Sequence, residues 1–173
     1  MRGYLFAAFL SAAGLSAYAQ SSSPRLTYDG FGAVRVGMME AEAIGKEGFI
    51  PEPRPLDKDS LREWEGCHYA EFTAKHVYAL VVDGRVGSIV IGKNSGVQTD
   101  SGISIGDDEA RVRKAYAGLR RTPAPYVIEP EHELYFQPGG RNENGFRFSI
   151  DADERVSKIY AGNGSIENME GCS

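Results

Sequence analysis

The chain has 173 residues, with 19 Lys and Arg against 24 Asp and Glu, and a formal net charge of −5 at pH 7. An acidic chain without a clustered basic stripe is poorly suited to nucleic acid, so we expect no nucleic-acid partner. The length suits one compact core, or two small units that share one.

Residues 1–19 are typical of a cleaved signal peptide. Arg2 precedes an apolar run from Tyr4 to Leu15, and the segment ends in the small-x-small pattern Ala17-Tyr18-Ala19. The run is short for a membrane span, although an uncleaved anchor is the alternative. We expect a mature chain that begins near Gln20, carries a formal charge of −6, and is periplasmic or secreted with no membrane span.

The first half of the mature chain, residues 20–92, predicts one helix and three strands. An extended segment ends at Gly37, and a short helix follows from Met39 to about Lys46. A proline-rich loop, FIPEPRPLDKDS, then leads to three strands, with Asp83-Gly84 as a strong hairpin turn between the last two. The expected strands are Cys67–Thr73, His76–Val82 and Arg85–Ile91.

Residues 93–101 form a polar linker, and residues 102–173 predict the same elements again. The expected helix runs from Asp108 to about Leu119, with Asp107 or Asp108 as its N-cap and an apolar face at helical spacing. A second proline-rich loop, RRTPAPYVIEP, precedes the strands. These are expected at His132–Gln137, Phe146–Asp151 and Arg155–Ala161.

Two blocks of matching residues indicate an internal duplication. Gly37 aligns with Gly106 at an offset of 69, and RVGSIVIG (Arg85–Gly92) aligns with RVSKIYAG (Arg155–Gly162) at an offset of 70. The sequence therefore predicts an α+β fold of two tandem helix–loop–three-strand repeats, which form an antiparallel sheet with helices on one face.

The junctions VRVGMMEAEA and ISIGDDEARV resemble a motif in which alternating apolar residues and a glycine open a helix. This motif is similar to one that occurs in tandem in the β-lactamase inhibitory proteins, and singly in the SmpA/OmlA-type envelope assembly proteins. Met39 and Asp107 depart from the residues usual in it. The resemblance implies a tandem α+β fold and a protein-binding role, without naming the partner.

The two cysteines, Cys67 and Cys172, predict one disulfide in an exported chain. The bridge would tie down the C-terminus and close a loop of about a hundred residues. A free thiol pair is the alternative.

Strand alternation places several aromatic and basic side chains on one face of the sheet. In GFRFSID, Phe146, Phe148 and Ile150 face the core and Arg147 faces outward; in RVSKIYAG, Tyr160 faces outward. Trp64 either anchors the loop before the first strand or contacts a partner. The candidate protein-binding residues are Trp64, Tyr69, Tyr135, Arg147 and Tyr160.

Two patterns could carry catalytic or metal chemistry, and we expect neither to do so. Gly102–Gly106 matches the nucleophile motif G-x-S-x-G around Ser104, but the chain lacks the alternating strand–helix pattern of its fold. His68, His76 and His132 lack a metal-ligand spacing, so we expect half-exposed strand and loop histidines. No metal, cofactor or catalytic residue is predicted.

The sequence thus favours an exported, non-enzymatic protein-binding module, such as an inhibitor of a secreted or envelope enzyme. The alternatives are an envelope structural or assembly factor and, less favoured, a small hydrolase built on Ser104 or the histidines.

Overall fold

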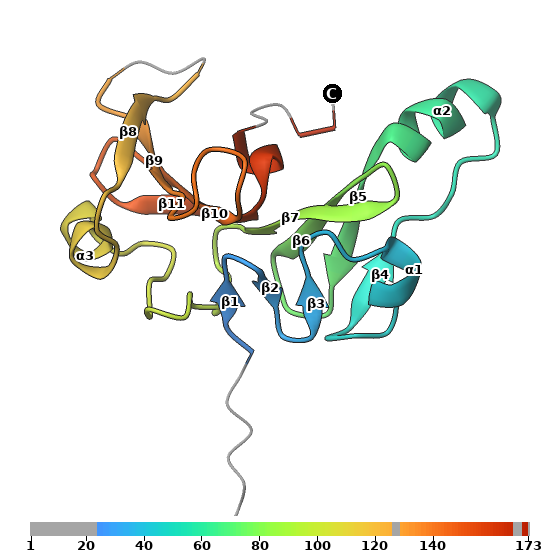
Figure 1. The fold of residues 1–173 in the computed structure, drawn as a ribbon, viewed down its shortest axis with the longest axis horizontal. Helices are drawn as coiled ribbons and strands as arrows, with labels where there is room; N and C mark the ends of the chain where they lie inside the picture. The colour runs from blue at the N-terminus through green and yellow to red at the C-terminus, as the bar shows by residue number, and fades with distance from the viewer. Residues whose placement is uncertain (1–23, 126–128, 168–170, 173) are drawn as a thin grey trace, which may run out of the picture.

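A computed structural model describes residues 24–125, 129–167 and 171–172, which form an α+β fold around an eight-stranded antiparallel sheet (Figure 1). The strand order is β4-β5-β6-β7-β11-β10-β9-β8, so β4–β7 fill one half of the sheet and β8–β11 the other. The predicted signal segment lies outside the described residues. The strands are β4 (Phe49–Pro51), β5 (Cys67–Phe72), β6 (Val77–Val82), β7 (Arg85–Ile91), β8 (Arg120–Pro123), β9 (His132–Phe136), β10 (Gly145–Ile150) and β11 (Val156–Gly162).

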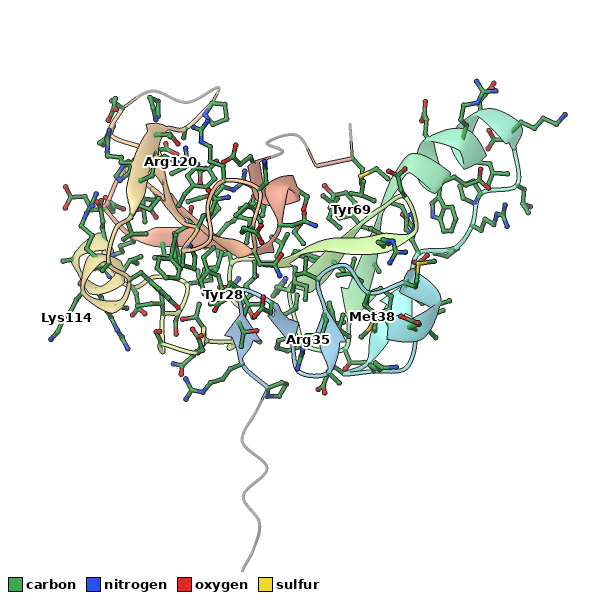
Figure 2. All side chains as sticks on the ribbon, viewed as in Figure 1. Tyr28, Arg35, Met38, Tyr69, Lys114 and Arg120 are labelled. Atoms are coloured by element: carbon green, nitrogen blue, oxygen red, sulfur yellow. A yellow bond between two sulfur atoms is a disulfide. The ribbon has the colours of Figure 1, made fainter. Side chains whose placement is uncertain are left out.

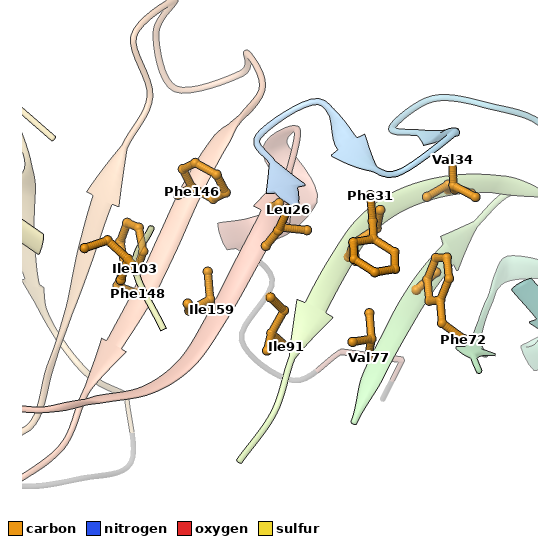
Figure 3. Packing of buried hydrophobic residues seen from close by; sticks show 14 of the residues in the cluster. Leu26, Phe31, Val34, Phe72, Val77, Ile91, Ile103, Phe146, Phe148 and Ile159 are labelled. Atoms are coloured by element: carbon orange, nitrogen blue, oxygen red, sulfur yellow. The ribbon is translucent and has the colours of Figure 1, made fainter. Parts of the chain in front are cut away.

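A small three-stranded sheet covers one face of the large one, which we call the inner face. It consists of β1 (Leu26–Thr27), β2 (Gly30–Phe31) and β3 (Val34–Arg35). Its buried side chains Leu26, Phe31 and Val34 pack over apolar residues of the large sheet (Figure 3). This layer was not expected, because strands of two residues leave no periodic pattern in the sequence.

Strand alternation along β10 and β11 is as expected. Phe146, Phe148 and Ile150 are buried in the core, as are Ile159 and Ala161 on the neighbouring strand. The same cluster takes in Ala43 of α1 (Glu40–Ala43) and Val112 of α3 (Glu109–Ala115), so both helices add to the inner side. The prediction of an α+β fold on an antiparallel sheet is confirmed.

Both predicted helices are shorter than expected. At α1 the N-cap residue Met39 makes no side-chain cap bond, and Gly45 follows with φ +79°. At α3 the N-cap is Asp108, but its side chain pairs with Arg155 at 3.2 Å instead of capping. The helix ends before Tyr116, whose side chain turns into the core.

The proline-rich loops contain elements that the sequence interpretation missed. The segment expected as the first loop carries β4 and then α2 (Lys58–Gly66), and the second loop begins with β8. Strands β4 and β8 form the two edges of the sheet, where proline is tolerated because one side needs no partner. A 3₁₀ helix, η1 (Gly164–Glu167), lies against β7, β10 and β11. No helix in the described ranges is long and apolar enough to cross a membrane.

Candidate functional site

Three of the five predicted binding residues meet on the outer face of the sheet, opposite β1–β3. Arg147 on β10 pairs in register with Tyr135 of β9 and Tyr160 of β11. Its guanidinium carbon lies 3.6 Å from the centre of the Tyr160 ring, a cation–π contact. Arg147 is only 2 % exposed and Tyr135 only 4 %.

Charged and polar neighbours complete this group, which we call the Arg147 cluster. Glu133 lies 3.8 Å from the Arg147 Nε and accepts a hydrogen bond from the Ser149 hydroxyl at 3.0 Å. Burial raises the pKa of Glu133, and the Arg147 charge opposes that shift. Arg120 lies 4.2 Å over the Tyr135 ring and pairs with Glu167 of η1 at 2.8 Å.

The Arg147 cluster is therefore a packed polar layer and not the exposed face that alternation suggested. The alternation was correct, since these side chains do point away from the inner core. Alternation says nothing about what covers that face, and here η1 supplies Glu167 to the cluster. Burial of both Arg147 and Tyr135 leaves little of the cluster for a partner to touch.

Trp64 lies on α2 and stacks on His68, with ring centres 4.0 Å apart and an interplanar angle of 9°. The His68 Nδ1 lies 2.7 Å from the Trp64 carbonyl oxygen, and its Nε2 lies 2.9 Å from Glu40 at the start of α1. Trp64 is thus part of the packing that joins α1, α2 and β5.

His132 occupies a similar setting on β9. Its Nδ1 lies 2.8 Å from the Pro130 carbonyl oxygen and its Nε2 lies 3.0 Å from Glu109 at the start of α3. The expectation of half-exposed histidines is wrong for His68 and His132, which are 3 % and 5 % exposed, because each joins a strand to the start of a helix. Among the described residues no group of three or more His, Cys, Asp or Glu is arranged to hold a metal.

Ser104 lies in irregular chain before α3. Its hydroxyl oxygen accepts a hydrogen bond from the Gln98 side chain at 3.2 Å, and its backbone N–H donates to Asp107 at 2.7 Å. No hydrogen bond in the described part of the chain joins Ser104 to a histidine.

Large exposed apolar side chains concentrate in one part of the chain. Within the described ranges, every such residue falls between positions 39 and 69. They belong to the ends of α1, to β4, to the segment before α2 and to β5. These residues are Met39, Ile44, Ile50, Leu56 and Tyr69, of which Leu56 is fully exposed.

A hollow of about 350 Å³ lies at this end of the sheet, between β4 and β5, and we call it the edge pocket. Ile50 pairs with Glu71 across the two strands, and Tyr69 lies two residues before Glu71, so all three side chains share the outer face. Figure 2 shows Tyr69 on the side of the sheet away from Arg35 and Met38. The full lining is Ile50, Pro51, Glu52, Pro53, Tyr69 and Glu71.

The predicted disulfide is present beside the edge pocket. Cys67 on β5 is bonded to Cys172, with a Cα–Cα distance of 5.2 Å. The bridge brings the C-terminal residues onto β5, where Gly171 sits so close to the Tyr69 hydroxyl that a side chain there would clash. The C-terminus therefore helps to set the position of one wall of the pocket.

A larger hollow of about 630 Å³ lies near the start of the described chain and is lined by Arg25, Phe31 and Lys75 among others. Its Arg25 guanidinium is already engaged, since it donates to the Thr99 carbonyl oxygen at 3.2 Å. The edge pocket is therefore the better candidate for a binding site.

Of the edge-pocket residues, the sequence interpretation named only Tyr69. Glu71 follows Tyr69 at the strand period of two, which is a usable signal for a shared face. Ile50 and Glu52 gave no such signal, because the prolines around them led us to expect a loop. No protein-family model, curated protein or solved structure matches this chain.

Proposed function

We propose that this chain is an exported, non-enzymatic protein-binding module that contacts its partner through the edge pocket and the exposed apolar side chains that line it. The observation that carries the proposal is that two exposed apolar side chains, Ile50 and Tyr69, line the same pocket on the outer face. Grouped exposed apolar residues mark interaction sites on soluble proteins more often than scattered ones do.

The disulfide and the signal-like residues 1–19 support a periplasmic or secreted location. Matching contacts support the duplication. The Arg85 and Arg155 side chains donate to the carbonyl oxygens of Gly37 and Gly106 at 2.9 and 2.8 Å. The N–H groups of the two glycines donate in turn to the carbonyl oxygens of Val86 and Val156, the residues that follow those arginines, at 2.7 Å.

The resemblance to the β-lactamase inhibitory proteins makes inhibition of a secreted or envelope enzyme the preferred form of this function. The resemblance to SmpA/OmlA-type proteins keeps envelope assembly as the second form. The two differ in the partner, which is one tightly bound enzyme in the first case and a membrane complex in the second.

The test is a pull-down from the envelope and secreted fractions of the source organism. The bait is oxidised protein that begins at Gln20, compared with an Ile50→Ala/Tyr69→Ala variant and with an Arg113→Ala/Lys114→Ala control on α3. A single enzyme retained by native bait and control, but lost with the pocket variant, supports an inhibitor, and its activity is then assayed with added protein. Membrane-complex subunits with the same dependence support assembly. A partner retained equally by all three baits contradicts the proposed contact surface.

A further inference from the structure

We propose that the edge pocket binds an arginine side chain of the partner protein. This inference rests on the proposed function and adds the chemistry that the partner must carry.

The lining of the pocket matches the three parts of an arginine side chain. Glu52 and Glu71 offer carboxylates for the guanidinium, which forms paired hydrogen bonds with such groups. The Tyr69 ring, 44 % exposed, offers a face for cation–π stacking. Ile50 and the two prolines offer apolar surface along which the aliphatic stem can lie.

The charge of the pocket is uncompensated within the described part of the chain. Its lining contains two acids and no base. The ion pairs among the described residues involve other carboxylates, and the nearby Arg54 is paired with Glu65 at 2.7 Å. A cation that enters the pocket therefore meets two carboxylates that have no competing partner.

The opposite edge of the sheet contains a comparable arrangement that is filled by the chain itself. Arg120 of edge strand β8 faces Tyr135 of β9, and its guanidinium lies over that ring and pairs with Glu167. On the other edge strand, β4, the residue that corresponds to Arg120 is Ile50, which pairs with Glu71 of β5. The first edge thus has Ile50 in place of the arginine, with Glu71 across from it and Tyr69 two residues before Glu71 on the same face.

The size of the pocket also fits one long side chain. A hollow of about 350 Å³ lies at the lower end of the range for small-molecule sites, so one long side chain suits it better than a cofactor. The side of β4 away from β5 is occupied by the chain itself, because the Phe49 N–H donates to the Lys46 carbonyl oxygen at 2.8 Å and the Phe49 carbonyl oxygen accepts from Gly45 at 3.4 Å. The partner therefore reaches the pocket with a side chain and does not add a strand to the sheet.

The test is an NMR titration of ¹⁵N-labelled oxidised protein, residues 20–173, with the peptide acetyl-Ala-Arg-Ala-amide. The comparison peptide carries citrulline, which has nearly the same shape without the charge. We expect the arginine peptide to shift the amide signals of Ile50, Glu52 and Tyr69–Glu71, to bind more weakly as NaCl is raised, and to bind at least tenfold more tightly than the citrulline peptide.

The matched variants are Glu52→Gln/Glu71→Gln and the control Glu143→Gln/Glu154→Gln, which removes the same charge from exposed positions in the other half. We expect the pocket variant to weaken binding of the arginine peptide about tenfold and the control to leave it unchanged. Equal binding of the two peptides, equal affinity of the two variants, or no binding at all overturns the arginine pocket. A partner that is captured equally by native and Glu52→Gln/Glu71→Gln baits overturns this inference while leaving the proposed function standing.

Discussion

At the scale of single residues, Glu133 shows how a polar group can be fixed on a sheet face without being offered to a partner. The side chain is 6 % exposed, and Ser149 and Arg147 contact its carboxylate. Burial is the larger effect, so the pKa of Glu133 is raised above its ordinary value of 4.5. Charging this carboxyl group therefore costs more in the folded chain than in the unfolded one.

That imbalance predicts a pH-dependent effect of Glu133→Gln. Between pH 4.5 and the higher pKa of the folded state, the folded chain binds more protons at this site than the unfolded chain, so its contribution to stability falls as pH rises. Glutamine does not titrate. The free energy of unfolding of Glu133→Gln, measured in urea, should improve relative to that of the native chain from pH 4 to pH 7, and a constant difference would contradict this assignment.

Single residues also mark the limit of what the sequence can predict about the site. Period-two alternation correctly predicted that Arg147 and Tyr160 point away from Phe146 and Phe148, because that depends only on neighbouring positions. The burial of Arg147 could not be predicted in this way, because it depends on the packing of other elements, among them η1 with Glu167. The edge pocket could not be predicted either, because it forms only where Ile50 of β4 pairs with Glu71 of β5.

At the scale of elements, α2 is a short helix held by its N-cap and by the stacking of Trp64 on His68. It has no buried residue and lies mainly against β5. Its N-cap Asp57 accepts a hydrogen bond from the Ser60 N–H at 2.9 Å. The prolines just before Asp57 led us to expect a loop, although an Asp in front of a run of polar helix formers is a recognisable start signal.

Replacing the cap should loosen α2 alone. This hydrogen bond lowers the pKa of Asp57 below 3.8, so the cap contributes fully above that value and is lost as the pH falls through the lowered pKa. In Asp57→Ala, amide hydrogen exchange measured by mass spectrometry should quicken over residues 58–66 at pH 7 and not over β6 and β7. The control is Asp59→Ala, which leaves the Asp57 cap in place, and equal exchange in the two variants would contradict the role of the cap.

At the scale of the whole molecule, the disulfide joins the first half of the sheet to the end of the chain. It links β5 to Cys172 across a sequence separation of 105 residues. In the chain-entropy model, a disulfide that closes a loop of this length stabilises the folded chain by about 4–5 kcal/mol. The unfolding free energy of Cys67→Ser/Cys172→Ser, measured in urea, should be lower by about that much, and native protein measured in a reductant should give the same value. A loss below about 1 kcal/mol would show that the bridge to the C-terminus does not stabilise the fold.

The two halves of the sheet also meet along β7 and β11, where backbones approach closely at Gly162. A Cβ at this position would lie 2.5 Å from the Gly87 carbonyl oxygen and 2.7 Å from the Ser88 Cβ. The clash is with backbone and a short side chain, so it can be relieved only by separating the strands. Since the core cluster runs across both halves, we expect Gly162→Ala to lower the unfolding free energy by about 1–3 kcal/mol.

Gly164 provides a matched control two residues further along. A Cβ there meets nothing within 4 Å and its φ is not positive, so Gly164→Ala should change the unfolding free energy little. In Gly162→Ala, amide exchange should quicken in β6 and β10 together, because each packs beside one of the two joined strands. Faster exchange in β10 alone would show that the halves unfold independently, and that the pairing of Ile91 with Ile159 joins two units without making their folding cooperative.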